Sequence, residues 1–214
     1  MKKTLKGLVT AGMIGLASLF PIKNVNAQDN KINASVELIQ SKDDPVSFIR
    51  PNIFYKLFGL DNYSFFEFYR NENFFGKTII SKDLGVRVKP TAELVYGSGF
   101  DDRCGLGANY AVPMPNGASL NVKALPVWFN KKGYIDDRVT VGYFGTLKLP
   151  LDFNLSAFGE ANIASKDGAQ WGYGEISLGK NLSDNFRIAY NPLLKNQGKL
   201  APRLEHAVAA KYTF

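Results

Sequence analysis

Apolar and polar residues alternate along most of the chain after residue 28, in runs of about 8–13 residues. Between 86 and 96, for example, Val, Val, Pro, Ala, Leu and Tyr occupy every second position, and mostly polar residues lie between them. The same phase recurs over 104–112, 139–149 and 153–163. A period of two predicts β-strands whose two faces meet different surroundings. No long segment in this part of the chain has helical periodicity, so the sequence predicts an all-β fold.

Turn residues separate these runs and set the number of strands. Asn116-Gly117 is a strong tight-turn pair, and residues 60–62, 82–85 and 183–185 are also rich in turn formers. The pattern predicts twelve antiparallel strands, near 31–40, 51–58, 63–70, 76–82, 85–96, 103–112, 118–129, 137–149, 152–163, 169–180, 185–195 and 202–214. Several phenylalanines blur the alternation between 51 and 82, so ten strands is the alternative.

The apolar phase of these strands indicates contact with lipid. A soluble β-sandwich also alternates, but its exposed face is normally charged, whereas the apolar phase after residue 85 carries almost no charge. Aromatic residues fall near strand ends, as in the girdles at membrane interfaces: Tyr96, Tyr110, Trp128, Trp171 and Tyr212. A sheet in lipid must close because no strand edge can stay unpaired there. The prediction is a transmembrane up-and-down β-barrel of about twelve strands.

The N-terminal residues have the three parts of a secretory signal. Lys2, Lys3 and Lys6 precede an apolar stretch from Leu8 to Phe20, which is short for a membrane-spanning helix. Val25-Asn26-Ala27 then offers a small-x-small cleavage site. We therefore expect residues 1–27 to be a cleaved signal peptide of an exported protein, and residues 28–214 to form one barrel domain.

The C-terminal strand carries a second signature. It ends Lys211-Tyr212-Thr213-Phe214, with apolar residues at alternate positions before the final aromatic. This strand resembles the terminal strand of bacterial outer-membrane β-barrel proteins. The resemblance implies a place in the outer membrane of a diderm bacterium, contact with its lipid and lipopolysaccharide, and recognition by the barrel assembly machinery through the strand that ends in Phe214.

Charge and cysteine content narrow the choice of partners. The net charge of +7 includes four lysines of the signal, and without them 22 basic residues face 19 acidic ones. No basic cluster or nucleic-acid motif remains, so nucleic acid is not an expected partner. The single Cys104 cannot form a disulfide within the chain, and its position in an apolar phase favours a packing role.

Few residues suggest catalysis or metal binding. The only histidine, His206, lies in the apolar phase of the last strand. No serine follows two residues later, so the chain lacks the histidine–serine arrangement of the barrel phospholipases. The arrangement of paired acids with a histidine found in the omptin proteases is not visible either. Asp101-Asp102 and Asp136-Asp137 suit either solvated loop charges or a divalent ion at the outer rim. We predict no enzyme activity, no catalytic residues, no metal site and no cofactor.

The inward phase supplies the candidate functional residues. The predicted lumen-lining charges are Arg87, Lys89, Glu93, Lys123, Arg138, Lys148, Glu160, Arg187, Arg203 and Glu205. Small inward residues, including Gly105, Gly107 and Gly142, indicate some open volume. A modest excess of basic groups favours anions in a pore. The sequence thus predicts a narrow outer-membrane channel, or porin, for small hydrophilic solutes with mild anion preference. The alternative is a non-conducting structural or surface-interaction barrel whose interior charges pair with one another.

Overall fold

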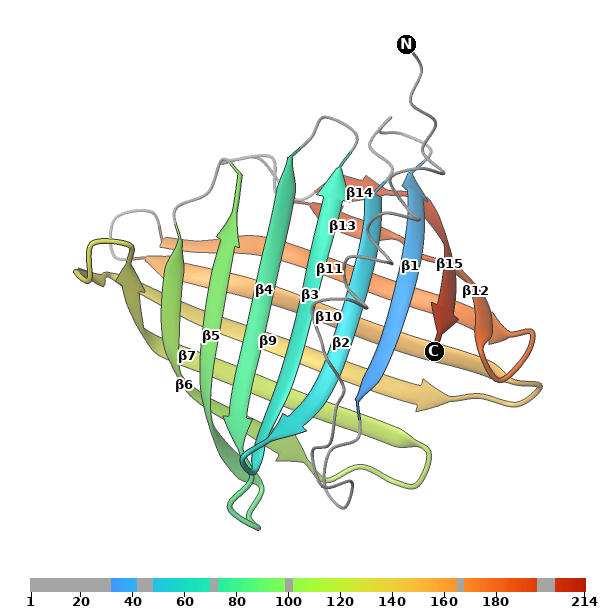
Figure 1. Cartoon of the computed structure of the whole chain (residues 1–214), viewed down its shortest axis with the longest axis horizontal. Coiled ribbons are helices and arrows are strands. Elements are labelled where there is room, and N and C mark those ends of the chain that lie inside the picture. The colour runs from blue at the N-terminus through green and yellow to red at the C-terminus, as the bar shows by residue number, and fades with distance from the viewer. Residues whose placement is uncertain (1–31, 42–47, 70–72, 99–101, 165–167, 196–202) are drawn as a thin grey trace, which may run out of the picture. The chain divides into compact units, whose positions relative to one another are not determined.

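The computed structural model describes residues 32–41, 48–69, 73–98, 102–164, 168–195 and 203–214. All regular elements within these ranges are strands (Figure 1): β1 (Asn33–Ser41), β2 (Phe48–Leu57), β3 (Leu60–Tyr69), β4 (Phe74–Lys82), β5 (Val88–Gly97), β6 (Arg103–Val112), β7 (Ala118–Asn130), β8 (Ile135–Asp136), β9 (Arg138–Lys148), β10 (Phe153–Ala164), β11 (Gly168–Asn181), β12 (Phe186–Tyr190), β13 (Leu193–Lys195), β14 (Arg203–Glu205) and β15 (Ala207–Thr213). No helix among these residues is long and apolar enough to cross a membrane.

The fifteen segments make twelve strands of one closed sheet. β8 and β9 both pair with β7, β12 and β13 both pair with β11, and β14 and β15 continue one another on the far side of β12 and β13. Pro192 lies in the break between β12 and β13, because proline has no N–H for the sheet. Neighbouring strands are antiparallel throughout, and β1 pairs with β15 to close the sheet. The prediction of a twelve-stranded up-and-down barrel is confirmed, and the alternative of ten strands is wrong.

The second and third strands begin earlier than the alternation predicts. β2 and β3 each start three residues before the predicted ranges 51–58 and 63–70. Phenylalanines occur on both faces here: Phe65 is buried inside the barrel, whereas its neighbours Phe66 and Phe68 face outward. Side chains still alternate between the two faces of the sheet here, but hydrophobic residues on both faces hide that alternation in the sequence.

The two faces of the sheet reverse the arrangement of a soluble β-protein. Among the described residues, sixteen buried ones are polar or charged and only eight are hydrophobic. Large apolar side chains such as Leu94, Leu106, Val141 and Ile188 are exposed on the outward face. A polar interior and an apolar exterior are the pattern of a β-barrel that spans a membrane.

One predicted girdle residue lies inside the barrel. The pairing of β6 with β7 shifts by one residue between Leu106 and Ala108, and this bulge reverses the phase of the rest of β7. Trp128 consequently turns inward, is 4% exposed and packs on Gly105. The expectation that Trp128 faces the membrane interface is wrong, because the alternation does not reveal a bulge. Tyr96, Tyr110 and Tyr212 keep the outward phase.

The barrel has two distinct ends. Five short turns join β2 to β3, β4 to β5, β6 to β7, β9 to β10 and β11 to β12, at the end where β1 begins and β15 ends. We call this the turn end and the opposite end the loop end.

Candidate functional site: a charged constriction in the lumen

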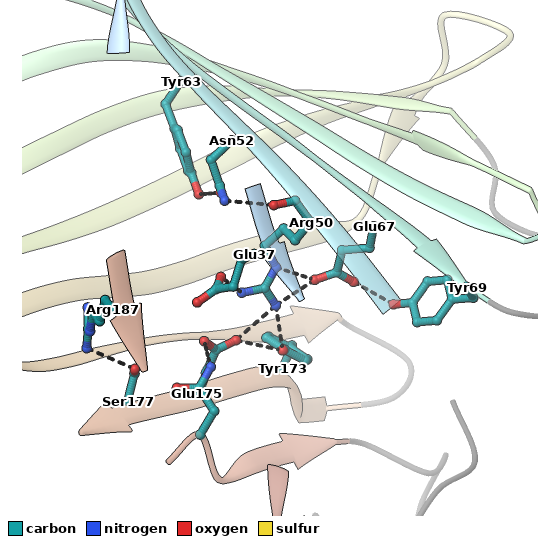
Figure 2. Close-up of polar contacts among 11 residues, drawn as sticks. Glu37, Arg50, Asn52, Tyr63, Glu67, Tyr69, Tyr173, Glu175, Ser177 and Arg187 are labelled. Carbon is teal, nitrogen blue, oxygen red and sulfur yellow. Dashed lines mark hydrogen bonds and ion pairs between the residues drawn. The ribbon is translucent and has the colours of Figure 1, made fainter. Parts of the chain in front are cut away.

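The first cluster of lumen charges surrounds Arg50 of β2. Its Nε and Nη2 atoms donate to Glu67 Oε1 of β3 at 3.0 and 2.7 Å, and Nη2 also donates to Glu175 Oε2 of β11 at 2.9 Å. Glu37 of β1 accepts from Nη1 at 3.4 Å, and the Tyr173 hydroxyl lies 3.1 Å from Nη2. Figure 2 shows these groups converging on one guanidinium. We call these five residues the Arg50 cluster.

Aromatic rings surround the guanidinium of Arg50. The guanidinium carbon of Arg50 lies 5.1 Å from the ring centre of Phe48 and 5.8 Å from those of Phe65 and Phe158. Arg50 is only 4% exposed. Cation–π attraction and charge-assisted hydrogen bonds together compensate for the desolvation of the guanidinium. Arg50 is not among the predicted lumen residues, because it lies in the gap between the predicted strands 31–40 and 51–58.

A second cluster joins two lysines to two glutamates. Lys77 Nζ of β4 lies 2.6 and 2.7 Å from the carboxylate oxygens of Glu160 on β10, and 3.1 Å from Glu93 Oε1 on β5. Lys123 of β7 pairs with the same two acids, at 2.6 Å from Glu160 Oε1 and in direct contact with Glu93. We call these four residues the lysine–glutamate cluster. Glu93, Lys123 and Glu160 are among the predicted lumen residues, whereas Lys77 belongs to the region whose phase was unresolved.

These contacts reach across the barrel interior. β4 and β10 are five strands apart along the wall, so the bond from Lys77 to Glu160 joins nearly opposite sides. Arg50 likewise reaches from β2 to β11. Figure 1 shows the corresponding walls, with β9, β10 and β11 behind β1 to β5. Glu93 is 0% exposed, whereas the Glu160 side chain, which contacts both lysines, is 22% exposed. The side chains of the two clusters thus narrow the lumen.

The space beside the inward glycines is filled by neighbouring atoms. A Cβ atom at Gly105 would lie 2.8 Å from the Trp128 ring, and one at Gly142 would lie 3.1 Å from Lys123 Cε. At Gly107 it would lie 2.0 Å from the backbone oxygen of Ala124. These glycines admit neighbouring groups, so the inference that they leave open volume is wrong.

Other charges pair near the two ends of the barrel. Lys89 lies 3.1 Å from Asp61 Oδ2 and 2.9 Å from Asp83 Oδ2 at the turn end. Asp83 is in the exposed turn before β5, where its hydrogen bond with Lys89 lowers the pKa of its carboxyl. At the loop end, Asp136 pairs with Arg103 at 3.3 Å. The described residues include no group of acids, histidines and cysteines arranged to hold a metal ion, and Asp101 lies outside them.

Arg187 lines the turn-end half of the lumen. Its Nη2 atom donates to Ser177 Oγ at 3.1 Å and to the backbone oxygen of Asn154 at 3.4 Å. Gly179 makes room for it, because a Cβ atom there would lie 2.0 Å from Arg187 Nε. Lys211 is the direct cross-strand neighbour of Arg187, so two cations share this part of the wall. Figure 2 includes Arg187 and Ser177 beside the Arg50 cluster.

The remaining predicted residues are dispersed. Arg138 begins β9 at the loop end, Lys148 is exposed at the other end of that strand, and Glu205 is buried in β14. Arg203 begins β14, and Arg87 is exposed in the turn before β5 rather than within that strand. His206 faces outward, where its ring stacks on Tyr190 and its Nδ1 atom is hydrogen-bonded to the Tyr190 hydroxyl.

Comparisons with known proteins agree with this architecture. No protein-family model and no curated protein matches the sequence. Among solved structures, the KdgM porin superposes with a TM-score of 0.59 at 11% identity, covering 85% of this chain and 99% of that porin. The fold is that of an outer-membrane β-barrel.

A second solved porin has the same degree of likeness. The NanC porin superposes with a TM-score of 0.57 at 7% identity, covering 86% of this chain and 99% of its own. At such low identity the likeness extends to the fold alone. The near-complete coverage of both porins shows that the described barrel corresponds to the whole of each.

Proposed function

We propose that this protein is a narrow outer-membrane channel for small hydrophilic solutes. The observation that carries the proposal is a closed, membrane-type barrel whose interior is lined by charged and polar side chains. The structural likeness to the KdgM and NanC porins supports it. In this proposal the turn end faces the periplasm, and the strand that ends in Phe214 is the one the assembly machinery recognises.

The selectivity of the channel follows from the groups outside the two clusters. The lysine–glutamate cluster is neutral overall, since two lysines face two glutamates. The three glutamates of the Arg50 cluster outnumber its arginine, but their side chains are at most 13% exposed. Lys148, Arg187 and Lys211 form no ion pair within the part of the chain that the structure describes. All three line the lumen in its turn-end half. Cationic groups in a pore favour anions, so we propose a mild anion preference set in that half.

The test is single-channel conductance of the refolded barrel in a planar bilayer, with the reversal potential measured in a salt gradient. Discrete conductance steps and a reversal potential on the anion side are expected. The double variant Arg187→Glu/Lys211→Glu shifts the reversal potential towards cations. Lys180→Glu is the matched control, because Lys180 lies on the outward face over Phe153. A conducting double variant with unchanged selectivity contradicts the assignment of anion preference to the cations of the turn-end half.

The cross-lumen ion pairs favour a second candidate function. Buried pairs between nearly opposite walls are also what a filled, non-conducting barrel would contain, and such a barrel would act through its surface or as an envelope component. The same bilayer recording separates the two. A folded, heat-resistant barrel that never conducts rules out the channel and leaves the structural role.

A further inference from the structure

Every short turn at the turn end exposes a large apolar side chain. Phe58 is 88% exposed and Leu151 is 79% exposed, and the other three turns carry Leu84, Met114 and Leu182, which are 45–56% exposed. We call these five side chains the turn tips. Turns facing water normally carry polar residues with glycine or proline, so five apolar tips at one end of the barrel need a physical reason.

Two of the turn tips stand in backbone conformations that disfavour their residue type. Phe58 has φ of 52° and is followed by Gly59 at 70°, between the paired residues Leu57 and Leu60. Leu151 has φ of 59° and precedes Asp152 at 62°. Two successive positive φ values define the mirror-image hairpin turn, in which Asn-Gly or Asp-Gly is strongly preferred. Phe and Leu are therefore present at positions where the backbone favours a polar residue.

The location of these two tips indicates what covers them. The β2–β3 turn and the β9–β10 turn are half-way round the wall from each other. At the first, the last outward-facing pair, Leu57 with Leu60, is apolar. At the second, Leu149 pairs with Phe153. The apolar outer wall thus continues to the turns on both sides, whereas a protein docked on one side would cover only one of them.

We propose that the turn tips are a membrane-contact ring that inserts into the boundary between head groups and acyl chains of the periplasmic leaflet. The occupant is phospholipid, whose apolar chains surround a barrel on all sides. Burial of Phe58 and Leu151 in that layer offsets the cost of the left-handed backbone. The inference rests on the outer-membrane location used in the proposed function, but not on conduction.

The first test uses the sign of a stability change. The double variant Phe58→Asn/Leu151→Asn relieves the backbone in both turns and removes the lipid contact. We expect the urea midpoint of the barrel in phospholipid vesicles to fall, because the lost burial outweighs the relief. The matched control is Asp152→Gly, which relieves the same turn without touching an apolar side chain and raises the midpoint. A rise in the double variant comparable to that of the control overturns the proposal.

The second test reads the depth of the tips directly and does not depend on the variants' stability. Phe58→Trp and Leu151→Trp are refolded in vesicles of phosphatidylcholine brominated near the start of its acyl chains. We expect each added tryptophan, taken as the difference from wild type, to be quenched and blue-shifted. Asp184 is an exposed polar residue of the β11–β12 turn, so Asp184→Trp is the control for a tryptophan that faces water.

Native Trp171 distinguishes the possible failures. It faces outward over Gly159 and Gly174 in the loop-end half, so its quenching reports that the barrel is inserted. Quenched Trp171 with unquenched, red-shifted tip tryptophans overturns the membrane-contact ring and leaves the tips free for a periplasmic protein. Unquenched Trp171 overturns membrane insertion itself, and with it the proposed channel. If the barrel does not conduct but its tip tryptophans are quenched, the proposed channel function is overturned and the membrane-contact ring stands.

Discussion

The bond between Lys77 and Glu160 gives the sharpest prediction, because it joins nearly opposite walls of the barrel. Lys77 Nζ contacts both carboxylate oxygens of Glu160 at 2.6 and 2.7 Å, and its side chain is 9% exposed. Lys77→Met leaves Lys123 alone with two carboxylates, one of them on the fully shielded Glu93. Removing one partner of a buried ion pair costs about 3–5 kcal/mol, since an uncompensated charge remains. We expect Lys77→Met to lower the free energy of unfolding by this amount.

The double variant Lys77→Met/Glu160→Gln restores neutrality, because Lys123 and Glu93 still pair. Its loss should fall short of the sum of the single losses by about 2–3 kcal/mol, in the upper range of coupling energies between contacting residues. The assay is urea unfolding of the refolded barrel in phospholipid vesicles, followed by tryptophan fluorescence. Lys180→Met, an exposed outward lysine, is the control and should change stability by about 0.5 kcal/mol at most. If the double variant lost as much stability as the two single variants together, the cross-lumen bond would be refuted.

Two further predictions concern the wall and the rim. Gly105→Ala places a methyl group 2.8 Å from the Trp128 ring, so we expect overpacking to cost about 1–3 kcal/mol in the same urea assay, and Trp128→Phe to restore part of it. Asp83 has a lowered pKa through Lys89, so its contribution to stability is present above the unfolded-state pKa and is lost as pH falls through the folded-state value. Asp83→Asn should therefore reduce the drop in urea midpoint between neutral pH and about pH 3, most clearly at low salt, and an unchanged pH profile contradicts the pairing.

Local sequence patterns were sufficient for the architecture wherever one face was uniformly apolar. Over β5, β9 and β10 the alternation identified the inward residues Glu93, Arg138 and Glu160. It failed over β2, β3 and β4, where phenylalanines occupy both faces, and so it missed Arg50 and Lys77. It also placed Trp128 outside, because a bulge shifts the phase without changing composition.

Local alternation was enough to establish the all-β class and the polar lining, because each of these depends on residues close together in the chain. The choice of twelve strands over ten, and the pairing of the lining charges, required the closed sheet. Arg50 and Glu175 are separated by 125 positions, and Lys77 and Glu160 by 83. Their contacts depend on the closure of the sheet and on the distance between opposite walls, and neither quantity is encoded in the alternation of any single strand. Closure of the sheet brings the inward charges of distant strands together in two buried clusters that narrow the lumen.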